Sequence, residues 1–353
     1  MSLPICIIGG GLAGLTAAYR LHQAGQPFFI LEARDRLGGR ILTEHLPDGA
    51  SIELGATWLG GKHQSLTRLL SELEVGIFEQ ALGQHAWYEP MSLQPPQLVD
   101  LPPNEAPSYR IQGGSDALIQ ALAGQLPEGR IFLNQAVTSL ERQADGVLVQ
   151  TPTQSWEAAK VIVTAPPALF AKHISCTPDL SADFLQLASL THTWMGESIK
   201  VGWNFPTPFW QETQQSGTIF SNVGPVSEMY DHSTHDEIGF ALKGFLNGGL
   251  ADASKAERKA MVRKQLSRYF GEEQLADGTY VEKIWRSEPF TFVDYEEFVL
   301  PHQHNGNPAL RRVFWEGKLF FAGSETAAGH PGYMDGAVER GEEVVREVMG
   351  VTL

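Results

Sequence analysis

A glycine-rich turn near the start of the chain constrains its fold more than any other feature. Residues 5–8 form a continuous apolar run, typical of a parallel strand buried on both faces, and the residues after the turn repeat with a helical period. Gly9, Gly11 and Gly14 satisfy the pattern G-x-G-x-x-G. In that motif the glycines permit a tight turn, a close approach of backbone to a pyrophosphate, and close packing of helix on strand. The start of the chain therefore predicts a dinucleotide-binding unit.

An acidic residue at the end of the next strand supports that prediction. Residues 28–31 are again apolar, and Glu32 follows them roughly 20 residues after the glycines. Its carboxylate is placed to accept hydrogen bonds from a ribose diol and would repel a ribose phosphate. A glycine-rich turn without a ligand is the alternative, but strand, helix and acidic residue together favour FAD or NAD over NADP.

The segment that begins at Glu32 distinguishes between FAD and NAD. Residues 32–40 read Glu-Ala-Arg-Asp-Arg-Leu-Gly-Gly-Arg, which resembles the E-A-R-x-R-x-G-G-R segment of the flavin amine oxidase superfamily. That superfamily includes monoamine and polyamine oxidases, L-amino acid oxidases and protoporphyrinogen oxidase, and in it this segment wraps the FAD pyrophosphate. A solvated basic turn is the alternative, which the paired glycines disfavour. The resemblance implies FAD contacts from Ala33, Arg34, Gly38, Gly39 and Arg40.

Further motifs in the family's order extend the resemblance along almost the whole chain. Residues 53–58 resemble the E-L-G-A-x-W/Y segment beside the flavin, and residues 161–167 resemble the V-I-V-T-x-P-P strand. Residues 321–326 and 332–338 resemble the C-terminal signature, whose helix points its N-terminus at the pyrimidine edge of the ring. The resemblance implies that Glu325 bonds the ribityl–phosphate portion of FAD. It also implies FAD contacts from Gly55, Ala56, Thr57, Val137, Gly323, Met334 and Val338.

The resemblance also implies two aromatic side chains that stand over the flavin face and orient the substrate amine. Tyr333 matches one of them through its flanking residues, and Tyr295, ten residues after Trp285, matches the other. Trp285 itself resembles a tryptophan that packs near the ring. The alternatives are an exposed strand aromatic for Tyr295, which follows Phe-Val-Asp in place of small residues, and an ordinary core residue for Trp285.

Lys200 is a candidate for the reaction with oxygen. It lies in the run 197–203, which resembles the family strand whose lysine holds a water against the flavin, and Pro-Phe-Trp at 208–210 supports the alignment. The resemblance implies that Lys200 positions this water and assists reoxidation of the reduced flavin by oxygen. The alternative is a lysine that points to solvent from an alternating strand.

Two departures from the family pattern bear on the cofactor and the substrate. Asp294 stands where monoamine oxidases carry the cysteine bonded to the flavin, and neither Cys6 nor Cys176 matches that position, so we expect non-covalent FAD. The stretch from Phe78 to Tyr109 is shorter than in relatives that insert a helical region over the substrate. We therefore expect a shortened pocket roof and do not predict which amine is bound.

The order of the predicted elements indicates two domains of an α/β protein, as the length of 353 residues suggests. After aromatic-rich strands and a helix at 254–270, the chain returns to the pattern of its beginning, with a helix at 334–349. The proline-rich stretch 90–107 is expected to be a connection or lid. We predict a Rossmann-like FAD-binding domain, with a parallel sheet, a glycine-rich βαβ unit and a β-meander, and an inserted α+β substrate domain with a mixed or antiparallel sheet. Their boundaries are expected at 1–78, 108–175 and 289–353 for the first domain, and at 79–107 and 176–288 for the second.

Composition excludes several other classes of protein. The chain has 26 basic and 41 acidic side chains and a formal charge of −15, which disfavours binding to nucleic acid. Its two cysteines lie far apart and give neither a disulfide framework nor metal-ligand spacing, so we expect no metal site. The sequence shows no membrane span and no signal peptide. We therefore expect a cytoplasmic protein without a membrane partner.

These patterns lead to a prediction of FAD-dependent amine oxidation. A hydride would pass from the carbon that bears nitrogen to the flavin, the imine would hydrolyse to an aldehyde or ketone, and oxygen would be reduced to hydrogen peroxide. The substrate would be a small-molecule amine. An L-amino acid oxidase or a desaturase-like enzyme on the same scaffold is the first alternative, although Trp58 lies where a carboxylate-binding arginine would be expected. A flavoprotein without turnover is the second. The oligomeric state is not predicted.

Overall fold

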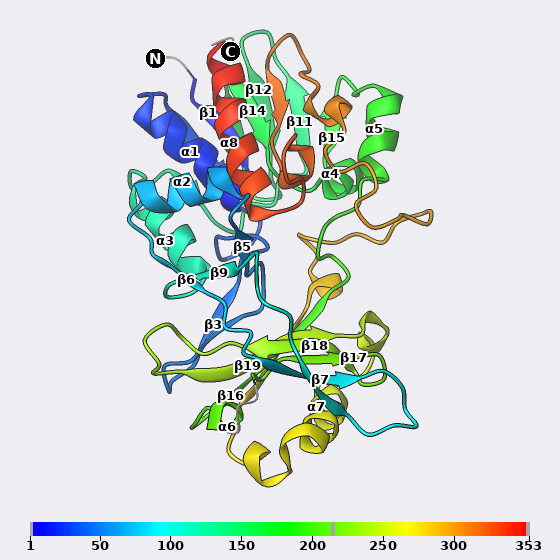
Figure 1. Cartoon of the computed structure of the whole chain (residues 1–353). Coiled ribbons are helices and arrows are strands. Elements are labelled where there is room, and N and C mark those ends of the chain that lie inside the picture. Colours follow the sequence, from blue (N-terminus) through cyan, green and yellow to red (C-terminus); the bar gives the residue numbers. More distant parts are fainter. Residues whose placement is uncertain (1–2, 213–215, 351–353) are drawn as a thin grey trace.

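A computed structural model describes residues 3–212 and 216–350, and its first layer is a parallel sheet. The strand order is β10-β2-β1-β14-β21, and all neighbouring strands run parallel. Segments from the beginning, middle and end of the chain therefore lie side by side, as Figure 1 shows at the top of the molecule. The strands are β1 (Ile5–Ile8), β2 (Phe28–Leu31), β10 (Ile131–Phe132), β14 (Lys160–Val163) and β21 (Leu319–Phe321).

Both faces of this sheet are buried, because alternate residues of each strand enter different cores. On one face, Ile5 and Ile7 pack against the helices α1, α2, α3 and α8. On the other face, Cys6 and Ile8 pack against a second layer that covers the sheet. This second layer consists of the helices α4 and α5 and a sheet in the order β13-β12-β11-β15. In that sheet β11, β12 and β13 form an antiparallel meander. The elements are α1 (Leu12–Gln23), α2 (Gln64–Glu72), α3 (Asp116–Gly124), α4 (Pro167–His173), α5 (Ala182–Ser189), α8 (Met334–Met349), β11 (Ser139–Arg142), β12 (Val147–Gln150), β13 (Ser155–Ala158) and β15 (Ser175–Thr177).

The lower part of the molecule in Figure 1 is a seven-stranded sheet in the order β20-β16-β19-β18-β17-β7-β8. Its neighbours are antiparallel except for β17 and β7, which run parallel. The parallel and antiparallel sheets confirm the α/β class and the mixed sheet that the sequence predicted. The strands are β7 (His85–Glu89), β8 (Gln97–Asp100), β16 (Ile199–Phe205), β17 (Ile219–Ser221), β18 (Val226–Asp231), β19 (Phe240–Leu246) and β20 (Tyr280–Ile284).

Helix α7 (Lys255–Phe270) covers one face of the seven-stranded sheet. Ser254 begins it with a capping box, in which its hydroxyl accepts from the Glu257 N–H and Glu257 accepts from the Ser254 N–H. The odd-numbered residues of β16 pack against this helix. The even-numbered residues, beginning with Lys200, point to the opposite face, toward the parallel sheet's half of the molecule.

The proline-rich stretch 90–107 is a correction to the sequence analysis, because it contains β8 as well as a loop. Pro95 and Pro96 precede the strand and Pro102 follows it, so the four residues that pair with β7 are free of proline. β8 is also an edge strand, where a lost N–H donor is tolerated on the open side. The composition signalled a loop because prolines flank the strand closely.

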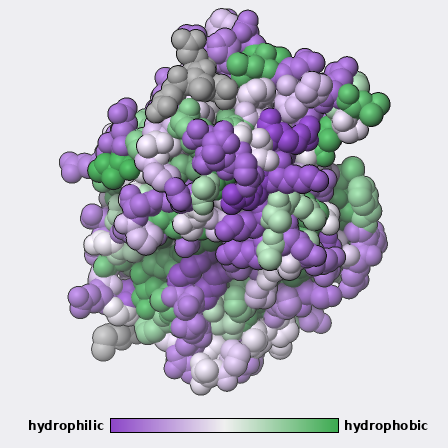
Figure 2. All heavy atoms as spheres, turned by 90° about the horizontal axis from the view of Figure 1, so that it is seen from below, coloured by the Kyte–Doolittle hydropathy of each residue, from purple (hydrophilic) through white to green (hydrophobic). Residues whose placement is uncertain are grey.

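Short elements connect the two halves. β4 lies between them, since Ile52 packs with Ala241 of β19. Among the described residues no helix is long and apolar enough to cross a membrane. Seen from below, hydrophobic residues form separate patches among hydrophilic ones (Figure 2). The connecting elements are β3 (Thr43–His45), β4 (Ser51–Glu53), β5 (Leu59–Gly60), β6 (Ile77–Glu79) and β9 (Ser108–Ile111), whereas α6 (Phe209–Glu212) packs in the core of the seven-stranded sheet.

Candidate active site

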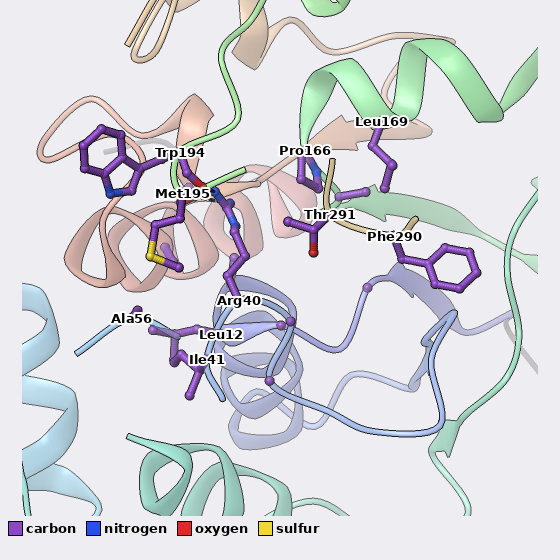
Figure 3. Close-up of a pocket in the computed structure, with 18 of the residues that line it drawn as sticks. Leu12, Arg40, Ile41, Ala56, Pro166, Leu169, Trp194, Met195, Phe290 and Thr291 are labelled. Carbon is purple, nitrogen blue, oxygen red and sulfur yellow. Dashed lines mark hydrogen bonds between the residues drawn. The ribbon is translucent and has the colours of Figure 1, made fainter. Parts of the chain in front are cut away.

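A cavity of about 1240 Å³ extends between the two halves of the molecule. It is lined at one end by the β1–α1 turn and at the other by the seven-stranded sheet, so one space joins the predicted nucleotide site to the predicted substrate site. Figure 3 shows Arg40 in the middle of this lining, with Leu12 and Ile41 below it and Trp194 above. Of the predicted site residues, those lining the cavity are Gly9, Gly11, Glu32, Ala33, Arg34, Gly38, Gly39, Arg40, Ala56, Thr57, Val137, Lys200, Tyr333 and Met334.

The glycine turn has the close backbone packing that the motif predicts. Gly9 has φ +108°, and a Cβ on Gly14 would lie 2.0 Å from the Gly9 carbonyl oxygen. Within the described residues no side chain caps the helix that starts after Gly11. The first N–H groups of α1 are therefore available to an anionic ligand in the cavity, which fits the pyrophosphate of a dinucleotide.

Glu32 is held at the edge of the cavity by backbone donors. Its Oε2 accepts from the Gly10 N–H at 2.6 Å, and its Oε1 accepts from the Arg34 N–H at 2.9 Å. A carboxylate has about four acceptor positions, so two hydroxyl donors of a ribose can still bind. The two backbone donors hold the carboxylate at the edge of the cavity, and its role toward a ribose stays a prediction.

The fully buried Glu325 forms an ion pair with the partly buried Arg40 beside the cavity. The two guanidinium nitrogens Nη1 and Nη2 lie 2.5 and 3.0 Å from the two carboxylate oxygens, and Nη2 also donates to Ser324 Oγ. Burial alone would raise the pKa of Glu325, but the charge and hydrogen bonds of Arg40 lower it below its ordinary value. Glu325 therefore orients Arg40, and it is Arg40 that reaches the cavity.

The N-terminus of α8 also faces the cavity. Tyr333 is the residue before the helix, and within the described part of the chain no side chain caps this end. Met334 and Ala337 line the cavity from the first turn. Asp335, in the same turn, accepts from the Leu66 N–H at 2.8 Å and fixes the helix against α2. The partial positive charge at the N-terminus of α8 can therefore stabilise an anionic part of a ligand in the cavity.

The seven-stranded sheet supplies the other end of the cavity. Lys200 of β16 is paired with Phe245 of β19, which is paired with Glu228 of β18, and all three line the cavity. Trp58 approaches this row from the connecting segment, with its ring 6.0 Å from that of Phe245. The sheet therefore contributes a cation, an aromatic ring and a carboxylate in one line.

Lys200 is buried and does not point to bulk solvent. Only 2% of it is exposed, and its Nζ donates to the Gly55 carbonyl oxygen. Burial lowers its pKa to about 8, although the charge of Glu53 opposes the shift. Lys200 is thus in direct contact with the segment 53–58, which the sequence analysis predicts to lie beside the flavin.

Lys243 is a second buried lysine, which the sequence analysis missed. It is fully buried, with Nζ 3.8 Å from the Trp58 ring centre and 4.4 Å from that of Phe245. The Nζ also donates to Thr57 Oγ1 at 3.2 Å. Burial lowers its pKa well below the ordinary value. A single lysine in the apolar strand 240–246 was the signal that could have found it.

The predicted aromatic residues are not all at the cavity. Tyr333 lines it, is 40% exposed, and has its ring centre 5.8 Å from that of Trp194, another lining residue that the sequence analysis missed. Tyr295 lies outside the described lining, and its hydroxyl accepts from the Thr193 N–H at 2.8 Å. The aromatic wall beside Tyr333 is therefore formed by Trp194 in this structure.

Trp285 supports the cavity from behind, and several predicted cofactor residues also lie outside the described lining. The indole of Trp285 is fully buried and donates to the Leu54 carbonyl oxygen at 2.7 Å, which fixes the segment beside the predicted flavin. Trp285 therefore holds the backbone at Leu54 in place. The other predicted residues outside the described lining are Gly14, Gly55, Gly323, Glu325 and Val338.

Comparison with known proteins identifies the family. The family described as "Flavin containing amine oxidoreductase" matches residues 12–86 and 77–349. The chain belongs to this family. Membership confirms the superfamily expected from the motifs, and it supports a flavin cofactor and action on amines in general.

Individual members are similar over almost their whole length. The probable flavin-containing monoamine oxidase A of Dictyostelium discoideum is 26% identical, over 98% of this chain and 97% of that protein. Putrescine oxidase of Kocuria rosea is also 26% identical, over 98% and 95%. A solved structure of putrescine oxidase bound to putrescine superimposes with a TM-score of 0.85 at 24% identity, covering 99% of both chains. These similarities confirm that the chain has the family's fold.

Proposed function

We propose that this flavin amine oxidoreductase is an FAD-dependent amine oxidase with oxygen as its electron acceptor. The observation that supports this most is the single cavity that runs from the uncapped start of α1 to the buried amine of Lys200. When bound, the flavin would accept the hydride from the carbon next to the amine nitrogen, and the resulting imine would hydrolyse to an aldehyde or ketone.

The residues of the nucleotide end would bind and orient FAD. The N–H groups at the start of α1 would hold the pyrophosphate, and Glu32 the adenine-side ribose. The start of α8 would face the pyrimidine edge of the ring. We propose that the binding is non-covalent, because neither cysteine lies in the described lining and Asp294 stands where monoamine oxidases carry the flavin-bonded cysteine.

The residues of the sheet end would receive the amine. Aromatic faces attract cationic and neutral amines. Tyr333, Trp58 and Phe245 line the cavity, and Lys243 lies against the rings of the last two. Glu228 is the carboxylate of this end, so the site suits small amines that carry a second cationic group, the class to which the substrate of the putrescine oxidases belongs. Lys200 would hold water and stabilise the negative charge that develops on oxygen.

Anaerobic titration of the purified yellow protein tests this function. Primary amines, diamines and L-amino acids are added in turn while the visible absorption of the flavin is followed. Amines should bleach the flavin, and air should restore the colour with formation of hydrogen peroxide. Bleaching by L-amino acids alone would replace the proposal with an amino acid oxidase. A flavin that no substrate bleaches would contradict amine oxidation altogether.

A further inference from the structure

Residues 288–295, which we call the strap, run along one wall of the cavity without forming a helix or a strand. Six consecutive strap residues, 289–294, line the cavity. Figure 3 shows Phe290 and Thr291 on this wall. The glycine turn and Glu32 line the same cavity, so the strap and the proposed nucleotide site share one space.

The strap begins at the half of the molecule that contains the seven-stranded sheet. Trp285, three residues before the strap, is fully buried. Its backbone N–H donates to the Ser198 carbonyl oxygen at 3.0 Å, and its indole donates to the Leu54 carbonyl oxygen at 2.7 Å. Ser198 directly precedes β16, which pairs with β20. The start of the strap is therefore fixed to this half.

Arg34 binds the strap to the half that contains the parallel sheet. It follows β2 by three positions, its Nε lies 3.2 Å from Glu288 Oε2, and its Nη2 donates to Thr291 Oγ1 at 2.6 Å. Burial opposes ionisation of Glu288, but the hydrogen bonds and charges of Lys283 and Arg34 lower its pKa below the ordinary value. The side chains of Arg34 and Glu288 are only 10% and 18% exposed, so salt screens this ion pair less than an exposed one.

Arg34 also contacts Glu32, the residue proposed to hold the ribose. Its backbone N–H donates to Glu32 Oε1 at 2.9 Å, and its Nη1 lies 3.9 Å from the same oxygen. The guanidinium thus contacts the strap through Nε and Nη2, and it approaches the proposed ribose ligand through Nη1. Closure of the strap and binding of the nucleotide therefore depend on one side chain.

Two aromatic residues hold the far end of the strap. Phe292 is 6% exposed and packs on Gly196, where an added Cβ would lie 2.5 Å from the Phe292 ring. The Tyr295 hydroxyl accepts from a backbone N–H of the same turn at 2.8 Å. Beyond the strap, the ion pair of Glu296 with Lys172 is exposed to solvent and should contribute little. The contacts that hold the strap in place therefore lie between Glu288 and Tyr295.

We propose that the strap closes the nucleotide end of the cavity over the bound dinucleotide, and that Arg34 is the positioning residue that holds it closed. A closed strap slows both entry and release of the dinucleotide, because either movement requires the contacts with Arg34 to break. A cofactor without a covalent bond to the protein is then retained kinetically. The inference rests on the proposed function for the identity of the dinucleotide as FAD.

The rates of FAD exchange test the strap without any amine turnover. Release is followed by flavin fluorescence after dilution of the FAD-loaded protein, and association by adding FAD to the full chain from which it has been removed. Glu288→Gln removes the charge that Arg34 contacts and keeps the shape, whereas Thr291→Val removes the hydroxyl. Each variant should raise both rates about tenfold, as expected for the loss of a hydrogen bond to a charged group. Glu296→Gln is the matched control at the exposed ion pair and should leave both rates unchanged.

The two rates distinguish a closing strap from a direct contact with FAD. A strap that opens more readily lets FAD enter and leave faster, so both rates should rise together. Faster release with unchanged association would overturn the proposal, because the loss of a contact that only binds the nucleotide acts mainly on release. Unchanged rates in both Glu288→Gln and Thr291→Val would overturn it as well.

Hydrogen–deuterium exchange of the wild-type protein decides the question even if a variant fails to fold. The N–H groups of Thr291 and Phe292 donate to the Glu288 carbonyl oxygen at 3.0 Å, and bound FAD should slow their exchange with solvent. Equal exchange of this peptide with and without FAD would contradict closure over the cofactor. A flavin that no amine bleaches would contradict the proposed function alone, since none of these measurements requires a substrate.

Discussion

Replacing Lys200 with methionine should stabilise the protein at neutral pH. Burial lowers the pKa of Lys200 in the folded state from its ordinary 10.5 to about 8. Between these values the unfolded chain binds a proton that the folded chain does not, so this lysine costs stability as the pH falls from about 10.5 to about 8. Below about pH 8 the whole penalty is present. Methionine has a similar length and no charge, and it removes the penalty.

The size of the gain follows from the pKa difference. Each pKa unit corresponds to about 1.4 kcal/mol, so the lysine costs about 3 kcal/mol at pH 7. The hydrogen bond from Lys200 to the Gly55 carbonyl oxygen is lost in the variant, at a cost of about 1 kcal/mol. The net expectation is a gain of about 2 kcal/mol in the free energy of unfolding at pH 7. Above pH 10 the gain should vanish and reverse, because only the lost hydrogen bond remains.

Urea unfolding in excess FAD at pH 7 and at pH 10.5 measures both limits. The midpoint should rise at pH 7 with an unchanged slope m. Lys283→Met is the matched control, since its amine is partly exposed and paired with Glu288; we expect it to lose no more than about 1 kcal/mol. If Lys200→Met gained nothing at pH 7, or gained equally at both pH values, the electrostatic reasoning would be refuted.

Three further predictions concern individual residues. Glu32→Ala should weaken FAD binding about 10- to 100-fold through loss of charged hydrogen bonds; unchanged affinity in a fluorescence titration would contradict the ribose assignment. Tyr333→Ala should lower kcat/KM for amines about tenfold while FAD content is retained, and parallel loss of flavin and activity would indicate a structural residue instead. Lys200→Met should slow the reaction of the reduced enzyme with oxygen roughly a hundredfold, measured by stopped flow after anaerobic reduction, and an unaltered rate would remove Lys200 from that step.

The nucleotide end was accessible from sequence because its chemistry is local. Gly9, Gly11 and Gly14 meet within one turn, and Glu32 reaches that turn from the adjacent parallel strand. A strand–turn–helix unit fixes these distances almost irrespective of the rest of the chain. The helices at 254–270 and 334–349 were likewise predictable, since a capping serine or an amphipathic period marks each of them.

The sheet end was less accessible because its neighbours are distant in sequence. Lys200 and Lys243 become neighbours only through the pairing of β16 with β19, and no local pattern specifies that register. Trp194 reaches the cavity from a loop, whereas Tyr295 is drawn away by its bond to the Thr193 N–H. The orientation of a loop side chain is set by such long-range contacts. A motif match therefore predicts the region in which the side chain lies better than the way it points. The role of Tyr295 and the domain boundaries remain predictions.

The alternation of β16, β18 and β19 separates two kinds of sequence change. Residues such as Val201 and Trp203 belong to the core under α7, whereas on the opposite face Lys200 lines the cavity and Gly202 packs against Ile52. Substitutions at every second position can therefore alter ligand preference while the hydrophobic core keeps its shape. Because the proposed dinucleotide site is built from other segments, a new specificity can evolve on this face without rebuilding that site. Saturation libraries confined to the cavity-facing positions should accordingly retain a high fraction of folded, yellow variants.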